Sequence, residues 1–176
     1  MKKFATVLIA LVLSGHAYGC TDPTEPSFLA SLENADSVFV FRVTTLRMID
    51  RRTDGHYNVI SGPIQLVKTI KGAPSFKRVA YQDISCGGIQ LIVGHYYLAS
   101  AKQNGSILAF VRGDNSVLDV TEEFEPLARP EIIRRGLTTS ITNYLAGKPL
   151  DKYTLRSLPF RNLYGAPPPQ PPMPRD

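Results

Sequence analysis

The segment from Ser37 to Leu46 constrains the fold of this chain more than any other. Its first half, Val38-Phe39-Val40-Phe41-Arg42-Val43, consists almost entirely of β-branched and aromatic residues, which are enriched in strands. Successive strand residues point to opposite faces of a sheet, so consecutive apolar residues indicate that both faces are covered. We therefore expect a mainly β protein in which this strand is central rather than at an edge.

Further strands are predicted after this one. They cover residues 57–70, 76–82, 95–101, 106–111 and, as a short strand, 117–120. Gly62-Pro63 interrupts the first of them, which indicates a bulge, a corner or a proline on an unpaired edge, and closed barrels use such corners. Asn104-Gly105 lies between two apolar runs and is the strongest local signal for a β-hairpin.

Two segments have helical periodicity instead. Residues 26–35 predict a short amphipathic helix that begins near Pro26, and residues 130–146 predict a longer one that begins at Pro130. The apolar positions of the two are Phe28, Leu29, Leu32 and Ala35 in the first, and Ile133, Leu137, Ile141 and Leu145 in the second. Gly147 and Pro149 predict the end of the longer helix.

The last part of the chain has a different composition. From Pro159 onward prolines are frequent and apolar residues that could form a core are few. Such a segment is typical of a disordered or polyproline II tail. It is interpreted either as an inert tail or as a polyproline ligand for a partner.

The first 19 residues are typical of an export signal. Lys2 and Lys3 precede an apolar run over residues 6–13, and Ala17-Tyr18-Gly19 supplies small residues for a cleavage site. No later run reaches the roughly 20 apolar residues of a membrane-spanning helix. We expect a periplasmic or secreted protein without a transmembrane segment.

Charge argues against a nucleic-acid partner. The net charge of +5 falls to +3 when the two lysines of the leader are removed. The basic clusters are short, as at Arg51-Arg52 and Arg134-Arg135, and lack interleaved aromatic residues for stacking on bases. Solvated basic faces are the expectation.

The chain contains only two cysteines, Cys20 and Cys86. In an exported protein a pair of cysteines favours a disulfide over a metal site or a catalytic thiol. The bridge would close a loop of about 67 residues, which the chain-entropy model values at about 4 kcal/mol.

No catalytic motif is evident. His56 and His95 have no cysteine, histidine or carboxylate at ligand spacing, so metal binding by side chains is unsupported, and His95 is interpreted as a structural residue at the start of its strand. The acidic residues form no pair that stands apart from loop and turn roles: Asp36, Asp54, Asp83, Asp114, Glu122 and Glu123. We expect a protein that is not an enzyme and carries no cofactor.

A family resemblance rests on five motifs in a fixed order. They are Cys20-Thr21 at the predicted cleavage point, residues 35–43, Val67-Lys68-Thr69-Ile70-Lys71-Gly72, Ser85-Cys86-Gly87 and Gly94-His95-Tyr96-Tyr97-Leu98. Between Cys20 and Val120 the chain resembles the netrin-like domain of tissue inhibitors of metalloproteinases and their bacterial relatives. The resemblance implies an OB-like fold, a five-stranded Greek-key barrel with an N-terminal and a C-terminal helix.

The resemblance also implies a binding site. In this family the amine and carbonyl of an N-terminal cysteine chelate a protease's catalytic zinc, and a disulfide ties that cysteine to a later loop; Cys20 and Cys86 match these positions. Thr21 matches the residue that enters the pocket beside the zinc. The implied protease-binding residues are Cys20, Thr21, Asp22, Pro23, Ile84, Ser85 and Cys86. Asp22 departs from the animal inhibitors, which have a second cysteine there.

The expected organisation is a signal peptide over residues 1–19, a netrin-like domain over 20–125, a helical extension over 126–150 and a proline-rich tail over 151–176. The expected function is to bind, and to inhibit, a zinc metalloprotease. Two alternatives remain open: a non-catalytic binding module of the cell envelope, and a lipoprotein anchored through Cys20, because Ala17-Tyr18-Gly19-Cys20 is a marginal lipobox. Lipidation would consume the Cys20 amine and sulfur, so it excludes the inhibitor mechanism.

Overall fold

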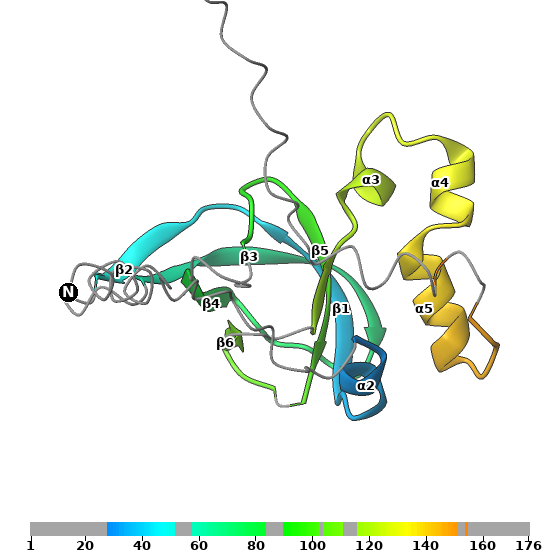
Figure 1. Ribbon diagram of the computed structural model, residues 1–176, viewed down its shortest axis with the longest axis horizontal. Coiled ribbons are helices and arrows are strands. Elements are labelled where there is room, and N and C mark those ends of the chain that lie inside the picture. Colours follow the sequence, from blue (N-terminus) through cyan, green and yellow to red (C-terminus); the bar gives the residue numbers. More distant parts are fainter. Residues whose placement is uncertain are drawn as a thin grey trace, which may run out of the picture.

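The computed structural model describes residues 28–51, 58–83, 90–102, 104–110, 116–150 and residue 154. Over these residues the protein is mainly β, with one sheet curled into a half-barrel and a few helices beside it (Figure 1). The strands are β1 (Ser37–Val43), β2 (Arg47–Arg51), β3 (Asn58–Lys71), β4 (Arg78–Asp83), β5 (Tyr96–Ala101), β6 (Ile107–Phe110) and β7 (Val117–Asp119). The helices are α2 (Phe28–Glu33), α3 (Thr121–Phe124), α4 (Pro130–Arg134) and α5 (Leu137–Leu145). None of the described helices is long and apolar enough to cross a membrane.

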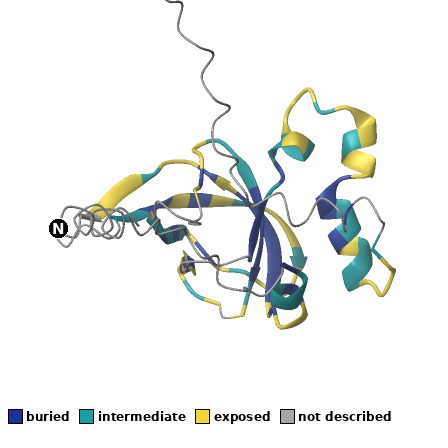
Figure 2. Ribbon diagram, viewed as in Figure 1, coloured by how far each residue is buried: buried dark blue, intermediate teal, exposed yellow. Residues whose placement is uncertain are grey.

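Strand β1 lies in the centre of the sheet, as its sequence predicts. The order is β6-β4-β3-β1-β5-β7, with β2 also paired to β3. Strand β1 is antiparallel to both neighbours, so that Phe39 lies opposite Thr69 of β3 and Ala99 of β5. Every residue of β1 except Arg42 is buried. The apolar character of both strand faces is therefore explained by cover on both faces (Figure 2).

The interruption at Gly62-Pro63 is a corner with a bulge, which confirms the prediction. Strand β3 pairs with β2 up to Ser61 and with β1 from Ile64 onward. Between these ladders residues 44–46 face only Gly62 and Pro63, so the strand opposite β3 holds one extra residue. A Cβ atom on residue 62 would lie 1.7 Å from the carbonyl oxygen of Thr45. Only glycine allows this approach of the two backbones.

The predicted hairpin around Asn104-Gly105 is wrong. Among the described residues β5 pairs with β1 and β7, whereas β6 pairs with β4 in the parallel sense. The side chain of Asn104 instead holds residues 73–75. Its Oδ1 accepts hydrogen bonds from the amide (2.8 Å) and hydroxyl (2.9 Å) of Ser75, and its Nδ2 donates to Ala73 O at 2.6 Å. These bonds direct the chain toward β4 rather than back along β5.

Two hydrophobic cores lie on opposite faces of the sheet. The barrel core fills the concave face and is rich in aromatic residues; its largest members are Phe39, Phe41, Phe76, Tyr81, Tyr97 and Phe110. The helix-facing core lies between the other face and the helices; its members are Phe28, Leu32, Ala35, Val38, Val40, Leu98, Leu118, Val120, Leu137 and Ile141. Consecutive residues of β1 alternate between the two cores. The predicted short helix is confirmed as α2, whose Phe28 and Leu32 are buried.

The predicted single helix over residues 130–146 is wrong, because two helices occupy this range. Helix α4 ends at Arg134 and α5 begins at Leu137. The first amides of α5 receive their acceptor from a distant residue, since the carboxylate of Glu123 accepts hydrogen bonds from Leu137 N (2.5 Å) and Thr138 N (3.1 Å). A Cβ on Gly136 would lie 2.4 Å from the Glu123 Cδ. The interruption between α4 and α5 therefore makes room for the Glu123 side chain of α3, which caps the start of α5.

Candidate functional site

The residues predicted to bind a protease lie outside the described residues. This holds for Cys20, Thr21, Asp22, Pro23, Ile84, Ser85 and Cys86, and so also for the predicted Cys20–Cys86 disulfide. The structure does describe β4, the strand that directly precedes Ile84-Ser85-Cys86. Strand β4 ends at Asp83, which lies opposite Asn58 of β3, and Asn58 lies opposite Arg51 of β2. Ile84 therefore follows the end of a three-stranded arm formed by β2, β3 and β4.

Apolar side chains are exposed on this arm. Met48 and Ile49 of β2 are 51% and 53% exposed. In a regular strand two consecutive residues point to opposite faces, so exposure of both side chains needs an explanation. The register between β2 and β3 shifts between Met48 and Asp50, so Ile49 is the extra residue of a bulge. Within the described residues β2 pairs with β3 alone, and exposed positions mark its length in Figure 2. Among the described strands, none pairs with the outer edge of β2, which carries these two apolar side chains.

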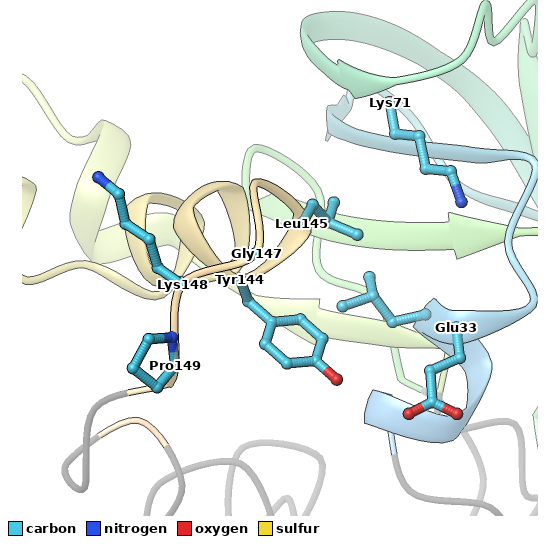
Figure 3. Close-up of a pocket in the computed structure, with 8 residues that line it drawn as sticks. Glu33, Lys71, Tyr144, Leu145, Gly147, Lys148 and Pro149 are labelled. Carbon is cyan, nitrogen blue, oxygen red and sulfur yellow. The ribbon is translucent and has the colours of Figure 1, made fainter.

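A groove of about 550 Å³ opens at the opposite side of the sheet, between α2 and the end of α5 (Figure 3). Its lining comes from three elements: Leu32 and Glu33 of α2, Lys71 of β3, and Tyr144, Leu145, Gly147, Lys148 and Pro149 at and after the end of α5. Figure 3 shows the Tyr144 ring extending from α5 toward α2, with its hydroxyl directed to the side on which Glu33 lies. An aromatic and aliphatic wall thus faces one carboxylate.

A helix C-terminal motif and a side-chain hydrogen bond hold this lining in place. Helix α5 ends in a Schellman motif, in which Gly147 has φ 83°, Gly147 N donates to Tyr144 O at 2.9 Å and Lys148 N donates to Asn143 O at 3.0 Å. The predicted stop at Gly147 is confirmed. Across the groove, the ammonium of Lys71 donates to Ala35 O at 2.6 Å. An ammonium has three donors, so this bond positions Lys71 and leaves donor capacity directed at the groove.

His95 precedes β5 and is fixed by polar and aromatic contacts. Its Nδ1 lies 2.9 Å from Asp119 Oδ2 at the end of β7, and its ring stacks on Tyr97. The other carboxylate oxygen of Asp119 accepts a hydrogen bond from Thr121 N at 2.8 Å. The histidine therefore joins the start of β5 to the end of β7 and the first turn of α3. This is the structural position that its place in the sequence predicts.

A basic and aromatic stack lies beside this histidine. The guanidinium of Arg42 is 5.5 Å from the centre of the Tyr96 ring, and Tyr96 stacks on Phe124 of α3 with ring centres 5.2 Å apart. Arg42 Nε also donates to Gly94 O at 3.1 Å. Every group in the stack is engaged with a neighbour within the protein, so we interpret it as a support for α3.

The part of the chain that the structure describes contains no group of three His, Cys, Asp or Glu side chains placed to hold a metal ion. Sequence reasoning missed the groove entirely. The local signals were present, since Gly147 and Pro149 predict a helix end, but nothing in the sequence indicates that this end lies against α2. No protein-family model matches the chain, and no curated protein matches its sequence.

Proposed function

We propose that the chain is an exported, non-catalytic netrin-like protein that binds a zinc metalloprotease through its mature N-terminal segment. The observation that most supports the OB-like fold on which this proposal rests is the pairing of β4 with β6, the one parallel ladder among otherwise antiparallel described ladders. In an OB-type Greek key the third strand of a meander pairs with the last strand, while the fourth returns to the first.

The strand order supports an OB-like barrel when β6 and β7 are taken together as its last strand. Strands β1, β3 and β4 form the meander, and β5 returns to β1. Strand β6 then pairs with β4 at one end of the sheet, and β7 pairs with β5 at the other. Only residues 111–116 separate these two strands in the chain, so the two ends of the curled sheet are tied together by a short link.

The chemistry proposed at Cys20 rests on the resemblance to the netrin-like family. A catalytic zinc keeps an open coordination position, and an α-amino group with its own carbonyl is a compact two-point ligand that displaces the attacking water. Such an amine titrates near pH 8, so a useful neutral fraction exists at physiological pH. A disulfide from Cys20 to Cys86 would restrict the amine before binding and so reduce the ordering cost.

The proposal is tested by titrating the mature protein against a panel of zinc metalloproteases. The matched control is a variant with one alanine inserted before Cys20, which keeps the disulfide but moves the amine away from the cysteine carbonyl. We expect inhibition by the mature protein and its loss in the extended variant. Equal potency of the two proteins, or inhibition by neither, would contradict the proposal.

Intact mass of the purified protein, measured with and without reduction, separates this function from the lipoprotein alternative. A mass that begins at Cys20 and increases by two hydrogens on reduction is expected. Added acyl mass would show that the amine is blocked and that the protein is an anchored module instead.

A further inference from the structure

We propose that the groove between α2 and α5 binds a polyproline II segment, and that its occupant is residues 166–174 of the same chain. Six of these nine residues are prolines, in the sequence Ala-Pro-Pro-Pro-Gln-Pro-Pro-Met-Pro. These residues lie outside the described part of the chain, and the lining of the groove indicates what kind of segment it can bind. The inference does not depend on the proposed protease-binding function.

The hydrogen-bonding groups of the groove fit a proline-rich ligand. A proline carries a carbonyl acceptor but no N–H donor, and a polyproline II helix makes no internal hydrogen bonds. Its binding site must therefore supply donors. The groove supplies the hydroxyl of Tyr144 and the ammonium of Lys71, which is held in place by its bond to Ala35 O. Lys148 also lines the groove, but its ammonium points away from Tyr144 and donates to Asn143 Oδ1 at 3.5 Å (Figure 3).

The apolar part of the groove fits as well. Polyproline II segments dock on aromatic-lined grooves, because the flat proline rings pack on aromatic faces and the extended helix loses little entropy on binding. Here the Tyr144 ring stands between α5 and α2 (Figure 3), and Leu32, Leu145 and Pro149 supply apolar parts of the lining. The open shape suits a ligand that lies along a surface rather than one that enters a cavity.

Charge complementarity favours this chain's own tail over an arbitrary proline-rich sequence. Glu33 is the acidic residue of the lining, and Arg175 directly follows the proline segment. A guanidinium and a carboxylate form the strongest class of side-chain hydrogen bond. Pairing of Arg175 with Glu33 would fix the direction in which the segment lies across the groove.

The length of the chain permits the contact. Thr154 is the last described residue and is buried, and Pro149, five positions before it, lines the groove. The twelve steps from Thr154 to Ala166 span up to about 40 Å when extended. A short tether gives an effective concentration of about 1 mM, so a site with a Kd of about 100 µM would be about 90% occupied.

Methionine methyl NMR of the full mature chain tests the inference, because Met48 and Met173 are its only methionines once Met1 leaves with the leader. Met173 reports on the tail, and Met48 on β2 reports on the fold. We expect the Met173 signal to differ from that of a synthetic peptide of residues 165–176 and to show nuclear Overhauser contacts to the Tyr144 ring. Identical Met173 signals in protein and peptide would overturn the proposal, as would a shift that changes on dilution, which indicates docking between copies.

Charge variants supply a second test that leaves the core untouched. Arg175→Glu should weaken the site about tenfold, which reduces occupancy to about half and moves the Met173 signal toward the peptide position. Arg161→Glu makes the same charge change outside the segment and should leave the signal in place. The double variant Glu33→Lys with Arg175→Glu should restore it. Equal effects of Arg175→Glu and Arg161→Glu would contradict the pairing, while an unchanged Met48 signal shows that the fold is retained.

Discussion

The two cores on either side of β1 are built in different ways. The barrel core joins residues of neighbouring strands, and its aromatic side chains stack on one another, as Phe39 does on Phe76 with ring centres 5.3 Å apart. Apart from Phe28, the buried members of the helix-facing core are aliphatic, and its helices are held by polar contacts between distant residues, such as Glu123 with the start of α5. Local strand patterns therefore specify much of the barrel side, whereas contacts that form only after folding specify the helix side.

The largest expected effect is in the barrel core. Phe39→Ala should lower the free energy of unfolding by about 3–5 kcal/mol, because a fully buried aromatic ring is removed and its partner Phe76 loses its stacking surface. Urea denaturation followed by circular dichroism measures this loss. The exposed Ile107→Ala on β6 is the control and should cost much less. A loss below about 1 kcal/mol for Phe39→Ala would show that the barrel interior is loosely packed.

The next residue of β1 tests the other face. Val40→Ala should cost about 2 kcal/mol, because Val40 is fully buried against the helices but loses only two methyl groups. The same denaturation experiment, run beside Phe39→Ala, compares the two cores on one strand. If Val40→Ala costs as much as Phe39→Ala, the helix-facing core contributes as much to stability as the barrel core does.

A smaller effect is expected at the start of α5, which is capped by the distant residue Glu123. Glu123→Ala should cost about 1–2 kcal/mol, because the amides of Leu137 and Thr138 lose the carboxylate that accepts their hydrogen bonds. Hydrogen exchange at these two amides should accelerate more than exchange in β1. The neighbouring Glu122→Ala, which removes an exposed carboxylate, is the matched control. Equal exchange rates in the two variants would show that α5 is not capped by Glu123.

On the barrel side the corresponding long-range polar contact is Asn104. Asn104→Ala should cost about 1 kcal/mol, because the hydrogen bonds to Ala73 and Ser75 are lost at an exposed position. Asn104→Asp keeps the acceptor for Ser75 and loses only the donor to Ala73 O. Its free energy of unfolding should therefore lie between those of Asn104→Ala and the wild type. If urea denaturation shows the same free energy of unfolding for Asn104→Ala and the wild type, strand pairing alone determines how the chain enters β6.

The smallest effect is expected at the contact between the two regions. His95→Gln should change the free energy of unfolding by less than about 1 kcal/mol, since both members of the His95–Asp119 pair are about one third exposed and solvent screens them. Thermal unfolding at low and high salt measures it. A loss of several kcal/mol would show that this contact joins the two cores cooperatively.

The barrel side could be predicted because strand period, β-branched residues and Gly62-Pro63 are local signals. The hairpin prediction failed because the Asn104 side chain bonds to residues 73–75, which its flanking sequence does not reveal. The single-helix prediction failed because the apolar stripe continues through Gly136, while Ile133 is half exposed and the second helix is capped by Glu123. The groove could not be predicted because it joins Glu33 to Tyr144, residues more than a hundred positions apart.

The place of β1 in the sheet determines the order in which the protein can be completed during synthesis. Strand β1 is the first of the described strands, yet its second neighbour, β5, ends only at Ala101, and the residues that cover its helix side follow as late as Ile141. A chain that extends only to Asp83 can therefore form a β1–β3–β4 meander with two open strand edges, one at β1 and one at β4. Such an edge is a template for aggregation. We expect the unfolded polypeptide to require a chaperone until β5 and β6 have paired and Leu137 and Ile141 cover the open face.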